Sequence, residues 1–257
     1  MDQKKVAIVT GAGAGIGKAI TIRLAKDGYV VVVNGRKSSN TFEVAKEIQD
    51  AGFECIGIVC DVSDEQQVDE MFAQVIQKYG RVDVLVNNAG VCPVRGLDEI
   101  TSGKFEQTIR TNLFSMFYCS KKAAEYMKRQ GGGRIINAGS QSSFRQNPQM
   151  IEYTTSKWAV RGFTRALAAA LGPFNITVNS YCPGTVITQM QLKNAEEYSS
   201  MMGITVEEYF KVRFKEIPMG RAQTPEEIAA FVSYLASDDA KNITGQNIML
   251  NGGHVMC

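Results

Sequence analysis

The fold of this chain is decided near its start, in the stretch Val6-Ala7-Ile8-Val9-Thr10-Gly11-Ala12-Gly13-Ala14-Gly15-Ile16-Gly17. A short apolar strand here runs into a glycine-rich turn, and a helical pattern begins immediately after it. Glycine allows the tight turn and the close approach of the backbone to a pyrophosphate, which the unpaired N–H groups of a helix N-terminus attract. A purely structural turn is the alternative interpretation. The position between strand and helix favours a dinucleotide site, and we expect Gly11, Gly15, Ile16 and Gly17 to bind the cofactor.

Beyond this stretch, short β-branched runs alternate with longer helical patterns. Strands are expected at residues 6–9, 30–33, 55–60, 82–86, 134–137, 176–181 and 247–250. Helices are expected at residues 16–26, 41–51, 65–78, 104–129, 153–171 and 225–237. Strands separated by helices form βαβ units. The sequence therefore predicts an α/β protein in which residues 1–257 form a single-domain Rossmann fold, with a doubly wound parallel seven-stranded sheet and helices on both faces.

One irregular stretch, about residues 188–219, interrupts this alternation. It is rich in methionine and glutamate, and it is interpreted either as a substrate-binding lid or as plain surface helices. In the first interpretation Met190, Met201, Met202 and Met219 form an adaptable apolar wall, although methionine also serves as simple gap filling.

Composition excludes several classes of function. Of the 257 residues, 44% are hydrophobic and 21% are charged, and the net charge is +2, which is too small for a sequence-independent grip on nucleic acid or anionic lipid. Neither a signal peptide nor an apolar run of the ~18 residues that cross a bilayer is present in the sequence. We therefore expect a cytoplasmic protein with no nucleic-acid or membrane partner.

Cysteine and histidine usage argues against a metal site. The six cysteines include no CxxC pair and lie mostly in apolar surroundings, so we expect buried thiols at Cys55, Cys60, Cys92, Cys119, Cys182 and Cys257. His254 is the only histidine, too isolated for a metal cluster or a Ser-His-Asp triad. The sequence predicts no metal ligands and excludes hydrolase chemistry of that kind.

The second strand lacks the acidic residue that binds the ribose hydroxyls of NAD. Gly35 and Arg36 follow it instead, and a guanidinium there complements a 2′-phosphate, so we expect NADP(H) to be favoured over NAD(H). The alternative is that Arg36 and Lys37 are solvated loop charges. Residues after the third and fourth strands complete the expected cofactor site, namely Asp61, Val62, Asn88, Ala89 and Gly90. Asp61 has two open interpretations, as a partner of the adenine amino group or as a cap of the next helix.

Tyr153 and Lys157 stand four residues apart in a helical pattern, so their side chains share one face. Bringing the pKa of a tyrosine from about 10 to about 7 takes roughly 4 kcal/mol. One ammonium group about 4 Å away supplies that order of energy at an effective dielectric constant of about 20. Ser140 ends a strand at the ligand-binding edge of the sheet, and Asn112 is a mid-helix asparagine. An exposed tyrosine–lysine pair is the alternative, which these neighbours weaken.

Together these residues resemble the short-chain dehydrogenase/reductase family, in its classical form. TGAGAGIG, NNAG, Asn112, Ser140, YTTSK and Pro183-Gly184 occur in the order of that family, over essentially the whole chain. The resemblance implies an enzyme in which Tyr153 transfers the substrate proton, Lys157 lowers the pKa of Tyr153 and holds the ribose, and Ser140 positions the carbonyl. It assigns Asn112 to a proton relay, and it implies a homotetramer. Four further residues are implied to lie beside the carboxamide of the cofactor, namely Pro183, Gly184, Val186 and Thr188.

A narrower resemblance is to the bacterial acetoin/diacetyl reductases, also called meso-2,3-butanediol dehydrogenases. It rests on IINAGSQ at 135–141, on Asn147-Pro148, on AVRG at 159–162 and on YCPG at 181–184. It implies hydride transfer between NADP(H) and a small diketone or hydroxyketone, with Gln141 and Asn147 binding the second oxygen beside Ser140 and Tyr153. Those relatives mostly use NAD, and the two amides have an alternative role in tying the loop to itself. Two alternatives remain open. One is an enzyme of the same family that acts on a sugar or polyol, a steroid or a 3-oxoacyl substrate, and the other is a non-catalytic NADP-binding sensor.

Overall fold

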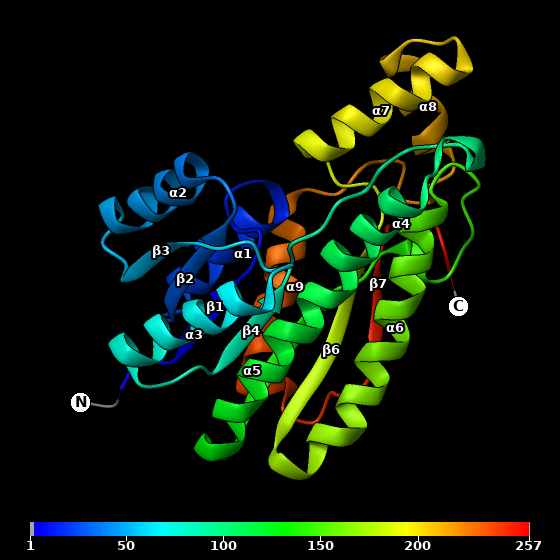
Figure 1. Ribbon diagram of the computed structural model, residues 1–257. Helices are drawn as coiled ribbons and strands as arrows, with labels where there is room; N and C mark the ends of the chain where they lie inside the picture. Colours follow the sequence, from blue (N-terminus) through cyan, green and yellow to red (C-terminus); the bar gives the residue numbers. More distant parts are fainter. Residues whose placement is uncertain (1–2, 257) are drawn as a thin grey trace.

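The computed structural model describes residues 3–256, and its strands form one parallel sheet (Figure 1). The order across the sheet is β3-β2-β1-β4-β5-β6-β7. The strands are β1 Val6–Val9, β2 Val30–Gly35, β3 Cys55–Val59, β4 Val84–Asn87, β5 Gly133–Ala138, β6 Ile176–Pro183 and β7 Asn247–Leu250. All seven predicted strands are present, so the predicted doubly wound Rossmann sheet is confirmed.

The helices lie on both faces of this sheet. They are α1 Gly15–Lys26, α2 Ser38–Asp50, α3 Glu65–Tyr79, α4 Ser102–Ile109, α5 Ser115–Gln130, α6 Ile151–Leu171, α7 Gln189–Met202, α8 Val206–Lys215 and α9 Pro225–Ala236. Side chains of α1, α2 and α9 pack on one face, whereas α3, α5 and α6 cover the other. Successive strand residues point to opposite faces, so Ala7 and Val9 join the first core and Val6 and Ile8 the second.

The predicted helix over residues 104–129 is wrong as one continuous element. It is divided into α4 and α5 by a π-helical turn at Arg110–Phe114, in which Asn112 is fully buried. A π-helical turn widens the backbone spiral locally, and such turns often occur at functional sites.

Segment 188–219 forms two helices, α7 and α8, which stand beyond the carboxyl ends of the strands (Figure 1). Thr188 caps α7 by accepting a hydrogen bond from the backbone N–H of Gln191, and Thr205 and Glu208 form a capping box at α8. These local signals start each helix.

Of the cysteines, Cys55, Cys60, Cys119 and Cys182 are buried as predicted, and Cys92 is half-buried. The prediction for Cys257 lies outside the described residues. Within residues 3–256, no helix combines the length and the apolar character needed to cross a membrane.

Candidate active site

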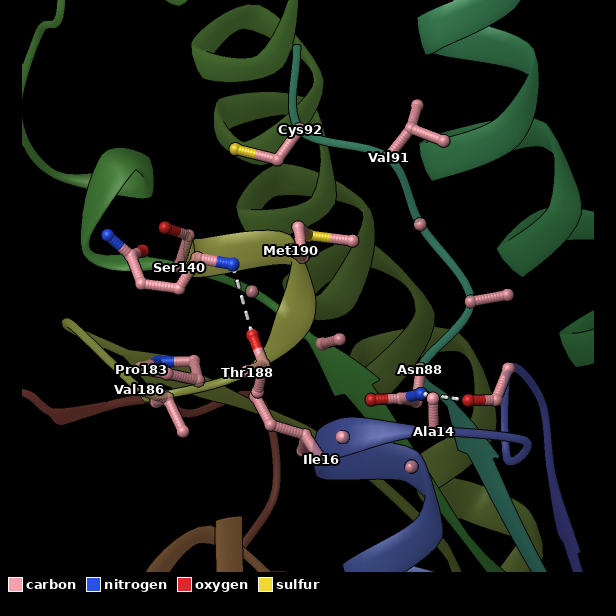
Figure 2. Close-up of a pocket in the computed structure, with 18 of the residues that line it drawn as sticks. Ala14, Ile16, Asn88, Val91, Cys92, Ser140, Pro183, Val186, Thr188 and Met190 are labelled. Carbon is pink, nitrogen blue, oxygen red and sulfur yellow. Dashed lines mark hydrogen bonds between the residues drawn. The ribbon is translucent and has the colours of Figure 1, made fainter. Parts of the chain in front are cut away.

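A cavity of about 310 Å³ opens at the carboxyl edge of the sheet, next to the point where the strand order reverses between β1 and β4. Open α/β sheets bind ligands at such a reversal. Figure 2 shows Ala14, Ile16 and Asn88 at one part of the cavity and Cys92, Ser140 and Met190 at another. The predicted site residues that line it are Gly11, Gly15, Ile16, Gly17, Asn88, Ala89, Gly90, Ser140, Tyr153, Lys157, Pro183, Gly184, Val186 and Thr188.

The glycine turn has the shape that a phosphate group needs. Gly11 and Gly15 adopt φ values of 62° and 54°, in the left-handed region that favours glycine. A Cβ on Gly17 would collide with the carbonyl group of Gly11 and with the side chain of Asn88. Ala14, at the N-cap of α1, has no side-chain acceptor for the N–H groups of the first turn. The turn and the helix end therefore fit the pyrophosphate of a dinucleotide.

Asn88 braces this turn against the sheet. Its Nδ2 donates to the carbonyl oxygens of Thr10 and Gly11, both at 3.0 Å, and its Oδ1 accepts from the hydroxyl of Tyr181 at 2.9 Å. Tyr181 lies on β6, is 1% exposed and was missed by the sequence interpretation. Its aromatic ring in a buried strand is typical of core packing, so only the fold reveals this bond.

Three predicted cofactor residues, Arg36, Asp61 and Val62, do not line the cavity. Nη1 of Arg36 lies 3.8 Å from Oδ2 of Asp61, and the Arg36 side chain is 58% exposed. Oδ1 of Asp61 accepts from the backbone N–H and the hydroxyl of Ser63. The helix-cap interpretation of Asp61 is wrong, because Asp64 caps α3.

Position 35, where NAD-binding sites use an acidic residue, is crowded by the side chain of Thr41. A Cβ added to Gly35 would lie 2.6 Å from Oγ1 of Thr41, whose hydroxyl donates to the carbonyl oxygen of Lys37. A side chain here would have to displace this hydroxyl and break its bond to Lys37.

Tyr153 and Lys157 project from α6 toward the cavity, as their spacing predicts. Nζ of Lys157 lies 5.5 Å from the centroid of the Tyr153 ring, and it donates to the carbonyl oxygen of Ala138 at 2.7 Å. Burial lowers the pKa of Lys157 to about 8. This lysine is therefore a strongly desolvated cation placed under the ring of the tyrosine.

The pKa of Tyr153 moves in the direction opposite to the prediction. Burial raises this pKa well above its ordinary value, the neighbouring Cys92 raises it further, and a hydrogen bond with Ser140 lowers it. Burial is the largest influence on the phenol, because desolvation disfavours the charged form of a tyrosine. That the Lys157 ammonium lowers this pKa stays a prediction.

Asn112 lies behind the cavity wall and does not line it. Its Oδ1 accepts from the backbone N–H of Val91 at 2.8 Å, and its Nδ2 donates to the carbonyl oxygen of Val91 at 2.9 Å. The same Nδ2 donates to Oγ of Ser156 at 3.0 Å. The side chain thus ties the segment after β4 to α6.

The two amides predicted to bind substrate do not line the cavity either. Gln141 is buried, and its Oε1 has no hydrogen-bond partner among the described residues. Asn147 donates from Nδ2 to the hydroxyl of Tyr198 on α7 at 2.8 Å, and it accepts from the backbone N–H of Gln149. In this structure Asn147 ties its loop to α7.

Several lining residues were missed by sequence reasoning, among them Val91, Cys92 and Asn194. Asn194 lies against Cys92, and burial raises the pKa of the Cys92 thiol to about 11. Met190 and Asn194 are four residues apart on α7, so a helical period for residues 189–202 would have placed them on one face.

Of the four methionines expected to form an apolar wall, only Met190 lines the cavity. Met201, Met202 and Met219 are more than half exposed. The wall prediction is wrong for these three, because they lie at the far end of α7 and beyond α8.

Comparison with known proteins places the chain among enzymes of one kind. The family model for short chain dehydrogenases matches residues 5–199. Short-chain reductase protein NovJ of Streptomyces niveus is 39% identical over 98% of this chain and 95% of its own length. L-2,3-butanediol dehydrogenase of Corynebacterium glutamicum is 37% identical over 97% of this chain and 98% of its own length. The (S)-acetoin-forming diacetyl reductase of Staphylococcus epidermidis is 35% identical, over 98% of each chain.

Solved structures give the same result. A variant of actinorhodin polyketide ketoreductase with NADPH superposes with a TM-score of 0.95, at 36% identity, over 98% of this chain and 97% of its own. YwfH, an NADPH-dependent reductase involved in bacilysin biosynthesis, has a TM-score of 0.93 at 29% identity, over 99% of each chain.

Proposed function

The chain belongs to the short-chain dehydrogenase/reductase family, and from this premise we propose that it transfers hydride between NADP(H) and the carbonyl group of a small diketone or hydroxyketone. Family membership makes it an oxidoreductase that binds a nicotinamide cofactor. The choice of NADP(H) and the choice of substrate are the proposed parts.

The observation that carries this proposal is the composition of one cavity. The glycine turn, which fits a pyrophosphate, and the side chains of Ser140, Tyr153 and Lys157 line the same space. If a dinucleotide were held at the turn by its phosphates, Ser140, Tyr153 and Lys157 would be the residues available to its reactive ring in the same cavity. When bound, the nicotinamide supplies or accepts the hydride.

Tyr153 is proposed as the proton donor to the oxygen of the carbonyl group. Burial raises its pKa, so the phenol keeps its proton at neutral pH and is poised for reduction. Ser140, whose hydrogen bond lowers the pKa of Tyr153, is placed to hold the same oxygen. The ammonium group of Lys157 stabilises the negative charge that develops as the proton leaves the phenol.

Asn112 is proposed to act through the architecture behind the cavity. It fixes Val91 and Ser156 relative to one another, and a Cβ on Gly90 would lie only 3.1 Å from its Oδ1. A water molecule beside this amide would complete the proton relay that the family resemblance implies.

The preference for NADP(H) rests on the end of β2. Gly35 brings no carboxylate, and Arg36 follows it on the surface. The N-cap of α2, Lys37, has no side-chain acceptor for the first N–H groups of that helix. A 2′-phosphate there would meet Arg36, Lys37 and the helix N-terminus, each favourable to an anion. The two NADPH-linked structures that superpose on the chain support the same choice.

The diketone or hydroxyketone assignment is supported by the diacetyl reductase and butanediol dehydrogenase relatives. An oxoacyl or polyketide carbonyl is the second candidate, favoured by the high superposition on the actinorhodin ketoreductase. In either case α7 and α8 are proposed as the lid over the substrate, because Met190 and Asn194 of α7 line the cavity. A homotetramer in the cytoplasm stays a prediction. Sedimentation velocity would measure the assembly state.

A cofactor and substrate matrix tests the proposal. NADPH and NADH oxidation is measured with diacetyl, acetoin, a 3-oxoacyl thioester, a sugar and a steroid ketone, for the wild type, Tyr153→Phe and Arg36→Ala. We expect the highest kcat/KM with NADPH and diacetyl. Tyr153→Phe should lower kcat by about 10² to 10⁴. Arg36→Ala should lower kcat/KM for NADPH by about tenfold or more and leave kcat/KM for NADH unchanged.

Two results would contradict parts of this assignment. A higher kcat/KM with the oxoacyl thioester than with diacetyl would replace the substrate class. A clear NADH preference in the wild type would reject the cofactor choice.

A further inference from the structure

A buried ion pair lies immediately beside the reacting tyrosine. Glu152, which precedes Tyr153 in the first turn of α6, is 1% exposed. Its Oε1 accepts hydrogen bonds from Nη1 of Arg95 at 2.6 Å and from Oγ1 of Thr108 at 2.9 Å. Its Oε2 is buried and has no partner among residues 3–256. The carboxylate is desolvated while its arginine partner is 32% exposed, and a pair of this kind adds little net stability, so stability alone does not account for it.

Arg95 is also attached to the same region through its backbone. Its N–H donates to the carbonyl oxygen of Gln149 at 2.8 Å, and it forms a parallel bridge with Met150. Side chain and backbone thus both join Arg95 to the residues that lead into α6.

The other end of the segment 91–95 is held as well. Asn112 binds both backbone groups of Val91 and donates to Ser156 in the second turn of α6. Between the two attachments stands Cys92, which lines the cavity and whose proximity raises the pKa of Tyr153. Segment 91–95, of which Val91 and Cys92 line the cavity, is therefore attached at one end to the second turn of α6 and at the other to the start of α6.

Resting on the proposed function, we propose that Arg95, Thr108 and Glu152 are positioning residues that set the separation between the Tyr153 hydroxyl and the facing wall at Val91 and Cys92. These three residues come from the loop after β4, from α4 and from α6, so the cluster joins three separate elements at one point. A misplacement of about 1 Å from a change outside the reacting groups costs up to about 10²-fold in rate. The glycine turn is not part of this frame, so cofactor affinity should be unaffected.

The chain offers a matched control in Arg81 and Asp83. Nη2 of Arg81 lies 2.6 Å from Oδ1 of Asp83, and the arginine is 28% exposed, compared with 32% for Arg95. This control pair precedes β4, at the edge of the sheet opposite the cavity. Arg95→Met and Arg81→Met each remove a guanidinium from an ion pair of the same length and keep an apolar stem.

The test compares kcat, the KM of the carbonyl substrate and the NADPH Kd from fluorescence titration, with Tm as the measure of folding. Arg95→Met should lower kcat by about 10- to 100-fold and leave the NADPH Kd within about twofold. Arg81→Met should lower Tm and leave kcat unchanged. Glu152→Gln, which keeps an acceptor oxygen for both donors, should retain most of kcat.

The double variant Arg95→Met/Glu152→Leu separates position from folding. It removes both charges, so it should recover the Tm lost in Arg95→Met while kcat stays low, and it carries the test if the single variant does not fold. Wild-type kcat in Arg95→Met or in the double variant would overturn the proposal, and so would an equal loss of kcat in Arg81→Met. If Tyr153→Phe retains wild-type kcat, the proposed function itself is contradicted. If Tyr153→Phe is inactive and Arg95→Met has wild-type kcat, only the positioning role is contradicted.

Discussion

The two ends of the cavity are held together by different kinds of contact. At the glycine turn, Asn88 binds the backbone carbonyls of Thr10 and Gly11, and a side chain at Gly11 would lie 2.8 Å from Cα of Ala89. At α7, contact with the rest of the protein runs through side chains, such as the hydrogen bond from Asn147 to Tyr198. The contacts at the glycine turn end on backbone atoms, which cannot move unless the turn moves, whereas the contact at α7 joins two side chains, which can change rotamer.

This difference suggests a division of roles. The glycine end has one permitted shape and suits a cofactor that is the same in every turnover. The α7 end, with Met190 in the wall and an aromatic stack of Tyr198 on Tyr209, is adaptable and suits the selection of substrate. Changes at the first end should therefore act on cofactor binding and folding, and changes at the second on the KM of the carbonyl substrate.

Filling the glycine turn is expected to have the largest effect. Gly17→Ala places a methyl group against the carbonyl of Gly11 and the amide of Asn88, and neither can withdraw without moving the turn. We expect a loss of about 1–3 kcal/mol in stability and an increase of up to about 100-fold in the NADPH Kd. Chemical denaturation and fluorescence titration measure the two quantities.

Gly162→Ala is the matched control, because a Cβ there meets no atom within 4 Å and the residue lies inside α6. It should raise stability slightly, since alanine is the better helix former. Equal effects at the two positions would show that the glycine turn is not the rigid end.

The pH dependence of reduction is expected to follow Lys157, which lines the cavity beside Tyr153 on α6. Burial lowers its pKa to about 8, so its charge is present below that pH and is lost as the pH rises through it. Tyr153, whose pKa is raised, keeps its proton over the same range. We expect kcat/KM for carbonyl reduction to fall about tenfold for each pH unit above 8.

Lys157→Arg keeps a positive charge that does not titrate in this range. Its kcat/KM should therefore not fall above pH 8, even if the activity is lower at every pH. A wild-type profile that stays flat until the ordinary pKa of tyrosine is reached would show that the Lys157 charge does not control the reaction.

Releasing α7 is expected to have the smallest effect. Asn147→Ala removes one neutral hydrogen bond to Tyr198, worth about 0.5–1.5 kcal/mol, so the KM of the carbonyl substrate should rise by roughly two- to tenfold. The NADPH Kd should stay unchanged. Steady-state kinetics with each substrate varied in turn separate the two constants.

Tyr198→Phe removes the same bond from its other side, keeps the stacking on Tyr209 and leaves the hydrogen bond from the backbone N–H of Gln149 to Asn147, so it should raise the KM by no more than Asn147→Ala does. A wild-type KM in Tyr198→Phe would show that the bond between Asn147 and α7 does not affect the binding of the carbonyl substrate.

Most of the fold was predictable, because it depends on short-range patterns. Strand runs such as 30–33 and helix signals such as Asp64 before α3 act locally, and element boundaries differ from the prediction by three residues at most, apart from the divided helix at 104–129. The π-helical turn in that helix was not predictable, because it is linked to the bonds between Asn112 and a distant segment at Val91. Local pattern carries no information about such a partner.

The candidate site divides in the same way. The glycine turn and the Tyr153–Lys157 pair follow from residue type and spacing, and the structure brings them to one cavity. The partner of Asn147, the pairing of Arg36 with Asp61 and the ion pair of Glu152 with Arg95 join residues 25 to 57 positions apart. No spacing rule reaches over such separations.

The sequence by itself determined the parallel sheet, the phosphate-binding turn and the residue types that meet a carbonyl group, because each follows from backbone conformation or side-chain chemistry within a few neighbouring residues. Only the tertiary structure decided how strongly those groups are desolvated, and this reversed the expected direction of the Tyr153 pKa. Burial depends on every element packed around a group, so the proton affinity of the phenol is a property of the fold and cannot be calculated from the motif that contains it.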